Sequence, residues 1–269
     1  MAESGLAVAR RGWADRRRSR LGWIIGLVLY TLMILAVWPS VEGSDSFADL
    51  AEDYPDAMKA LFGGNEAFET ITTPVGFLNS YIFAFMLPLL LAVMVIGLGA
   101  GLLGEEQEDG LLDLLLAQPV SRVRTVVEKA LVIVAQVALV TAPVIVLILL
   151  AGPTVDLEAP VGGTLAAALG TVLYAVLHGL VSLFGGAVTG RRAAALTIGA
   201  VVVVAGYLFS TVSELASWAE PLRYASPLHH ATAGNPVANG MPANYLVLVV
   251  TAAAVLGATI VLFDRKDLT

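Results

Sequence analysis

The sequence predicts an all-α membrane protein with six transmembrane helices and both termini in the cytoplasm. Of its 269 residues, 58% are hydrophobic and only 14% are charged, which leaves too little polar surface to cover a soluble globule. Six charge-free apolar stretches are long enough to cross about 30 Å of hydrocarbon as helices. The basic residues then fall almost entirely on one side of the resulting topology.

The six predicted spans are uniformly apolar, which excludes the alternating pattern of barrel strands. Trp23 and Trp38 flank the first span at the interfacial depth that tryptophan prefers. A cleaved signal peptide is the alternative for this span, but no small-x-small cleavage site follows Trp38-Pro39. The approximate bounds are 21–38, 77–101, 130–151, 163–188, 193–213 and 243–263.

The distribution of Lys and Arg predicts the orientation. Only Lys59 and Arg223 lie in the loops 39–76 and 214–242, whereas the other thirteen of the fifteen basic residues lie on the opposite side. Positive residues concentrate on the cytoplasmic side of membrane proteins. The two loops are therefore predicted to be extracellular and the segment 104–129 to be cytoplasmic. The net charge of −7 argues against a nucleic-acid partner.

Three further segments have recognisable character. Residues 1–20 combine arginines with apolar side chains, which predicts a basic amphipathic helix on the cytoplasmic leaflet; a frayed basic tail is the alternative. The acidic loop 39–76 has near-helical apolar spacing from Phe47 to Phe62, which predicts a short amphipathic helix. The loop 214–242 is irregular but aromatic, which is typical of an interfacial or re-entrant element.

No catalytic or metal site is predicted. Gly99, Gly101 and Gly104 match G-x-G-x-x-G, but they end a membrane helix and precede acidic residues, so small-residue packing explains them better than phosphate binding. The sequence lacks a Walker A loop, and its three histidines form neither a metal site nor a catalytic triad. The chain is therefore predicted to be no enzyme by itself.

Polar residues within the spans are weak candidates for a substrate pathway. His178 is the one ionisable group predicted at membrane depth, and such groups are often functional. Asn79 in span two and Tyr174 in span four, which also contains His178, are uncharged polar residues. The alternative for His178 is a hydrogen-bonded residue on a packed helix face.

The segment 104–129 is the most informative part of the chain. Span two ends in an acidic cluster, and a short helix is predicted over 111–117, with three leucines on one face. An exposed leucine-rich helix beside a membrane favours a partner with a hydrophobic groove; packing on its own bundle is the alternative. The residues concerned are Glu105, Glu106, Glu108, Gly110, Leu111, Leu114, Leu115, Pro119 and Arg122.

This segment resembles the signature of permease subunits of ABC-2-type exporters. In that family a span ends in an E-x-E-x-G-T-L-like stretch, followed by L-L, P-x-S-R and a lysine before the next span. The chain departs from the pattern at the threonine, because Leu111 follows Gly110 directly. The loop sequence 226–229 and the ending 263–268 also resemble the family. The matching residues are Glu106, Glu108, Gly110, Leu111, Leu114, Leu115, Pro119, Ser121, Arg122 and Lys129.

The resemblance implies a type-2 ABC exporter permease fold in the cell membrane. It implies a second permease copy or a related permease as partner, and cytoplasmic ABC ATPase subunits that carry ATP and Mg²⁺, with no cofactor bound by this chain. The helix 111–117 is then the coupling helix that contacts the ATPase. A stand-alone secondary transporter and a membrane anchoring subunit without transport activity remain the alternatives.

Overall fold

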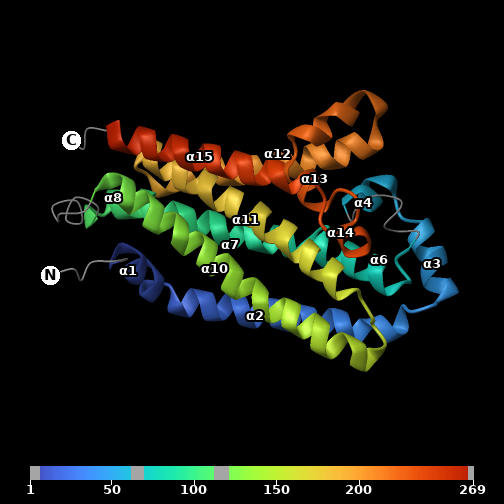
Figure 1. Cartoon of the computed structure of the whole chain (residues 1–269). Coiled ribbons are helices and arrows are strands. Elements are labelled where there is room, and N and C mark those ends of the chain that lie inside the picture. Colours follow the sequence, from blue (N-terminus) through green and yellow to red (C-terminus); the bar gives the residue numbers. More distant parts are fainter. Residues whose placement is uncertain (1–6, 62–69, 112–120, 266–269) are drawn as a thin grey trace.

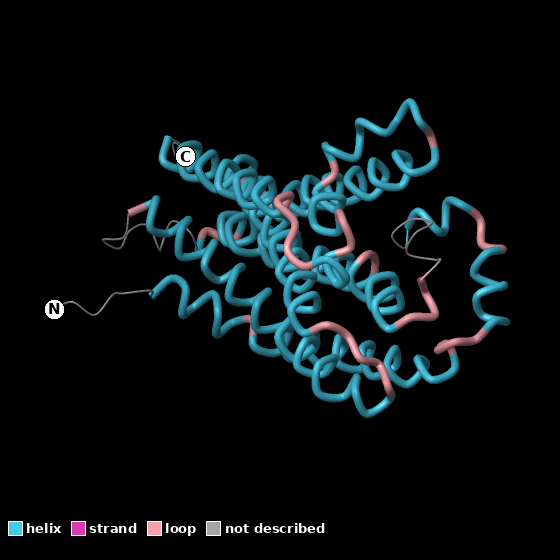
Figure 2. Tube along the Cα trace, turned by 45° about the vertical axis from the view of Figure 1, so that its right-hand side comes forward, coloured by secondary structure: helices cyan, strands magenta, loops and turns pink. Residues whose placement is uncertain are grey.

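The computed structural model describes residues 7–61, 70–111 and 121–265, which fold as a bundle of long helices (Figures 1 and 2). Six helical stretches of the described residues are long and apolar enough to cross a membrane. The predicted all-α architecture with six spanning helices is therefore confirmed. The stretches are Arg17–Ser40, Pro74–Glu108, Arg122–Val155, Val161–Thr189, Arg192–Leu215 and Tyr245–Arg265.

Two helices form the centre of the bundle. The buried share of the most apolar part of a span is 72% for the span that contains α11 (Val161–Thr189). It is 67% for the span that contains α7 (Met86–Ala100). The corresponding share is only 28% for α2 (Arg17–Val37) and for α12 (Arg192–Leu215), and 17% for α15 (Tyr245–Arg265). The outer helices therefore present broad apolar faces to lipid or to another membrane subunit.

The third span extends further toward its charged end than its apolar stretch indicates. Its helix α10 is Arg122–Ala151, and η4 (Gly152–Val155) continues it. Ser121 caps the start, because its hydroxyl oxygen accepts a hydrogen bond from the Arg124 N–H at 3.2 Å. The apolar stretch ends where charged residues begin. The helix itself extends to the residue whose side chain satisfies its first free backbone N–H groups.

The second span is built from five helical pieces. It runs through α6 (Pro74–Leu78), the π-helical η2 (Asn79–Phe83), α7, the π-helical η3 (Gly101–Glu105) and α8 (Glu106–Glu108). The helix breaks at Phe85 and restarts so that Pro88 falls in the first turn of α7. Proline is tolerated in a first turn because its missing N–H needs no partner there. π-helical turns often occur at functional positions.

The two ends of the bundle differ in character. The helix α1 (Ala7–Asp15), α8 and the last turn of α15 lie at one end (Figure 1). The helix α1 packs on α10, where the Ala9 N–H donates to the Glu128 carboxylate at 3.0 Å. Arg20 lies over the Trp13 ring at 4.0 Å and donates to the Trp13 carbonyl. This basic helix therefore folds back onto the bundle.

The loop between spans one and two lies at the opposite end of the bundle (Figure 1). The region in which a short helix was predicted holds two short helices, α3 (Asp45–Glu52) and α4 (Asp56–Leu61). Pro55 separates them, since proline disfavours helical geometry in the preceding residue and cannot continue the hydrogen-bond ladder.

The loop before span six folds into three short helices, η5 (Ser217–Ala225), α13 (Pro227–Thr232) and α14 (Pro236–Asn239). Ser226 caps α13 and donates to the Gly206 carbonyl of α12 at 2.7 Å. The Ala231 carbonyl oxygen lies 2.6 Å from the position that a Cβ on Gly170 would occupy. Gly170 is about 14 Å along α11 from its first residue, so α13 lies beside the span and not beyond its end.

Candidate functional site

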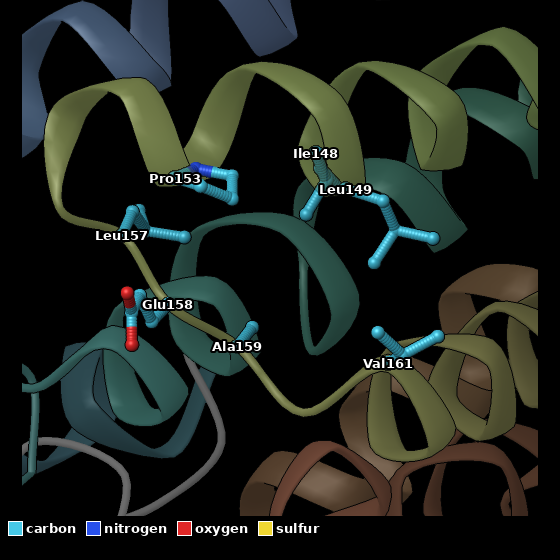
Figure 3. Close-up of a pocket in the computed structure, with 7 residues that line it drawn as sticks. All are labelled: Ile148, Leu149, Pro153, Leu157, Glu158, Ala159 and Val161. Carbon is cyan, nitrogen blue, oxygen red and sulfur yellow. The ribbon is translucent and has the colours of Figure 1, made fainter.

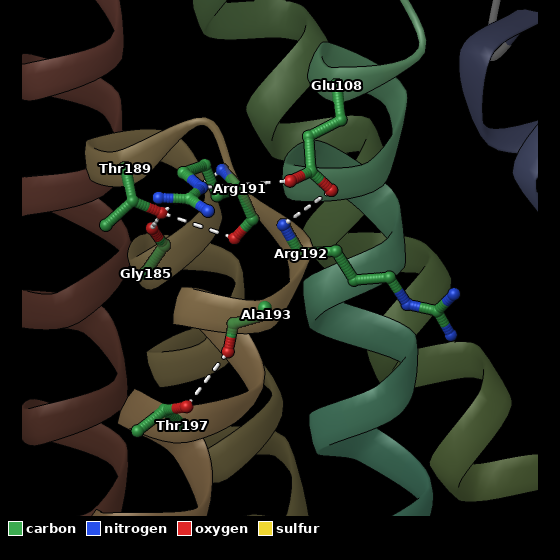
Figure 4. A network of polar contacts seen from close by, with 7 residues as sticks. All are labelled: Glu108, Gly185, Thr189, Arg191, Arg192, Ala193 and Thr197. Carbon is green, nitrogen blue, oxygen red and sulfur yellow. Dashed lines mark hydrogen bonds and ion pairs between the residues drawn. The ribbon is translucent and has the colours of Figure 1, made fainter.

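The acidic residues at the end of span two pair with basic residues from two other spans. Arg192 Nη1 lies 2.9 Å from Glu105 Oε1, and Lys129 Nζ lies 2.5 Å from Glu106 Oε2. The Arg192 backbone N–H donates to Glu108 Oε2 at 3.1 Å (Figure 4). We call this cluster the charged junction; it consists of Glu105, Glu106, Glu108, Lys129, Arg191 and Arg192.

The pairs of the charged junction differ in strength. The Lys129 side chain is 1% exposed and also donates to the Leu102 carbonyl in η3. A buried ion pair is costly to break, because removal of one partner leaves the other charge poorly solvated. Arg191 Nε is 4.0 Å from Glu108 Oε1, and its side chain is 74% exposed (Figure 4). Such an exposed pair contributes little, so Lys129 is the main electrostatic connection.

Glycines allow the backbones to meet behind the charged junction. A Cβ on Gly104 would lie 2.9 Å from the backbone of Arg191 and Arg192, and a Cβ on Gly99 would lie 2.4 Å from the Gly179 carbonyl oxygen of α11. Neither position has room for a larger residue without movement of backbone. The interpretation of the G-x-G-x-x-G match as helix packing is therefore confirmed.

Both sides of the segment between spans two and three are held in place. On the first side, Gly110 has φ of 69° and ends α8, a conformation that glycine adopts readily. On the second side, Arg122 Nη1 donates to the Phe263 carbonyl at 3.2 Å and to the Asp264 carbonyl at 3.4 Å, at the end of α15. Leu111 is partly exposed, and Leu114, Leu115 and Pro119 lie outside the described residues.

The polar residues proposed for a pathway are enclosed within this single chain. His178 and Tyr174 are each 0% exposed and Asn79 is 5% exposed. His178 Nδ1 lies 2.8 Å from the Tyr174 carbonyl oxygen, and the two rings are 4.2 Å apart. His178 Nε2 and Asn79 Oδ1 have no hydrogen-bond partner among the described residues. His178 and Tyr174 are therefore part of the buried packing face of α11.

The histidines outside the spans do not form a metal site. His230 Nε2 lies 2.9 Å from the Tyr224 carbonyl oxygen, and the rings of His229 and His230 are 5.6 Å apart. Burial, and then the neighbouring His230 and Arg223, lower the pKa of His229 to about 4, so it is neutral at pH 7. Within the described ranges, no three His, Asp or Glu side chains gather as metal ligands.

A small pocket of about 250 Å³ opens at the other end of the bundle, between the end of α10 and the start of α11 (Figure 3). Its lining is apolar except for Glu158, and the other lining residues include Ile148, Pro153 and Val161. None of the sequence-predicted site residues lines it. Within the part of the chain that the structure describes, the predicted site residues Glu105, Glu106 and Glu108 lie together in the charged junction and not in this pocket.

The sequence indicated the acidic half of the charged junction but not its basic half. Arg191 and Arg192 indicate the orientation of the chain, and the predicted topology also places them on the same side as Glu105 and Glu108. Their location on one side of the membrane is the sequence signal that indicates ion pairs between these arginines and glutamates. Which arginine meets which carboxylate depends on the close contact between Gly104 and the α11–α12 turn.

Comparison with protein families places the chain in a known family. A family model described as "ABC-2 family transporter protein" matches residues 6–268. No curated protein matches the chain significantly. The family match spans all six membrane helices and the charged junction. This chain therefore belongs to the ABC-2 family of transporter membrane proteins.

Proposed function

We propose that the chain is the membrane-spanning subunit of an ABC exporter, driven by ATP that a separate cytoplasmic ATPase hydrolyses. The family is a membrane transport component that associates with ABC ATPase subunits. ATP and Mg²⁺ bind the partner, and this chain contributes no catalytic group. A second copy of the chain or a related permease completes the transmembrane pathway in the cell membrane.

The observation that carries this proposal is the way the segment between spans two and three is held. Glu105 and Glu106 connect its start to spans five and three, and Arg122 connects its end to span six. A displacement of the segment is therefore transmitted to spans three, five and six through short polar contacts. This is the coupling that a rigid-body change of access requires.

The coupling step follows from these contacts. The leucine face of 111–117, with Leu114 and Leu115, seats in a groove of the ATPase. Closure of two ATPase subunits on ATP moves both segments, and the two states of the bundle differ in their contacts with the ATPase. Lys129 of α10 pairs directly with Glu106 of α8. A movement of α8 is therefore transmitted to α10 through this ion pair as well as through the segment that connects them.

The same proposal places the charged junction in the cytoplasm. Most basic residues lie at the end with α1 and α8, in agreement with the positive-inside pattern. The chain has no cysteine, so a single introduced cysteine reports its own side. An impermeant maleimide should label Trp218→Cys in intact cells and Ala14→Cys only after lysis, since both positions are exposed. Labelling of Ala14→Cys in intact cells would show that the chain has the opposite orientation in the membrane.

The experiment that tests the function is co-purification from a mild neutral detergent. A tagged full-length chain should retain a Walker A ATPase, and ATP hydrolysis by the complex should stop when the Walker A lysine of that ATPase is replaced. If no such ATPase is retained and activity in cells survives ATP depletion but not collapse of the ion gradients, the chain is a secondary transporter.

A further inference from the structure

A second pocket, of about 340 Å³, opens between α2 and α7 beside the charged junction. Its lining changes character with depth. Arg16, Glu105 and Arg192 lie at one end of the pocket, and Trp23, Val93 and Gly97 lie further along the spans. Gly97 is about 12 Å from Glu105 along the helix, and Trp23 is about 10 Å from Arg16. Both walls therefore pass from charged to apolar in the same direction.

The charged end of this pocket carries more positive than negative charge. Arg192 Nη1 is 2.9 Å from Glu105 Oε1, and these side chains are 47% and 39% exposed, so solvent and ligands reach the pair. A Cβ on Gly101 would lie 2.4 Å from Arg16 Nη2 and 2.9 Å from Glu105 Oε2. The absence of that Cβ lets both side chains cover Gly101. Two guanidinium groups thus face one carboxylate, which favours an added anion.

The depth of the pocket indicates the kind of anion. The pocket lies where apolar spans give way to charged residues, and Trp23 marks the interface between hydrocarbon and headgroups. Its volume is at the lower end of the range for small-molecule sites, roughly 300–1,000 Å³. It therefore has room for a headgroup and the beginning of an acyl chain. Val93 is 55% exposed and continues the apolar wall onto the outer surface.

We propose that this pocket binds an anionic phospholipid of the adjoining leaflet. Arg192 and Arg16 hold the phosphate, and an acyl chain lies along Trp23 and Val93. The proposal concerns the permease alone and does not depend on an ATPase partner. Because Arg192 also pairs with Glu105, the bound phosphate lies next to the contact that joins span two to span five.

Native mass spectrometry of the full-length protein in neutral detergent tests this proposal. Dioleoyl phosphatidylglycerol should bind at least about tenfold more tightly than dioleoyl phosphatidylcholine, because both lipids offer a phosphate but the choline group places a positive charge beside the two arginines. Glycerol 3-phosphate, which offers the phosphate without chains, should bind more weakly than phosphatidylglycerol. Equal binding of the two lipids would overturn the proposal, and so would glycerol 3-phosphate binding as tightly as phosphatidylglycerol.

Two matched pairs of variants locate the site. A Cβ on Gly97 meets nothing within 4 Å, so Gly97→Leu should place its side chain in the pocket and remove the preference for phosphatidylglycerol. Gly257→Leu on α15, equally open, should leave the preference intact. Arg192→Gln should weaken binding about tenfold, whereas Arg265→Gln should not. If Gly97→Leu keeps its unfolding temperature and still prefers phosphatidylglycerol, or if the controls lose the preference equally, the lipid binds elsewhere.

Discussion

Lys129→Met should lower the free energy of unfolding of the permease by about 3 kcal/mol, the lower end of the range for breaking a buried ion pair. The Lys129 side chain is 1% exposed and that of Glu106 is 23% exposed, so the carboxylate that remains regains only part of its hydration. The Leu102 carbonyl also loses its donor. Titration with a denaturing detergent, followed by circular dichroism, measures this change.

The control for this prediction removes both charges together. In Glu106→Gln with Lys129→Met no unpaired charge remains, so most of the stability should return. A single Lys129→Met variant as stable as the wild type would show that this pair does not hold spans two and three together. A double variant no better than the single one would indicate lost packing of the lysine side chain instead.

Leu114→Asp with Leu115→Asp should abolish retention of the ATPase. Burial of each leucine contributes about 1.5–3 kcal/mol, so loss of both weakens binding by roughly a hundredfold or more. The introduced carboxylates add a desolvation cost on top of this. The amount of ATPase that co-purifies with the tagged variant measures the effect.

The control places a carboxylate on an exposed apolar residue of the other loop. Met241 is 66% exposed and lies between α14 and α15, so Met241→Asp should leave ATPase retention unchanged. Both variants should reach the membrane in normal amounts. Wild-type retention by the double aspartate variant would exclude 111–117 as the coupling helix.

The sequence predicted the spans because hydrocarbon imposes one requirement on every residue that crosses it. All six apolar stretches are helices in the structure. The helices continue past the apolar stretches at charged ends, as at 130–151, where α10 already begins at Arg122. A hydropathy window reports solvent preference alone, whereas helix length also depends on caps and ion pairs such as Ser121 with Arg124.

Other features depend on contacts between distant residues and so could not be predicted from local pattern. The π-helical turn η3 and the close approach of Gly104 to Arg191 belong to one packing arrangement. Pro55 marks the break between α3 and α4 in the sequence, whereas the apolar spacing over Phe47–Phe62 does not show it. Proline was the stronger local signal, because it removes a backbone donor.

Only the acidic residues of the candidate site were predicted from the sequence, because their basic partners are distant in the chain. Charge and topology indicated that Glu105, Glu106 and Glu108 lie on the side with most basic residues. They did not indicate that Lys129 is buried, since its partner is 23 residues away and its second acceptor is a backbone carbonyl. Burial of a charge is a property of packing and not of sequence pattern.

Site-specific crosslinking in living cells determines whether the segment beside Leu111 contacts a cytoplasmic ATPase. A photoreactive amino acid at Leu111, the last described residue before 112–120, should form an adduct whose second polypeptide contains a Walker A loop. The same group at Trp218, which is 78% exposed in the opposite loop, should form none with that polypeptide. Absence of the ATPase adduct at Leu111, or an equal yield at Trp218, would mean that this segment does not dock the ATPase.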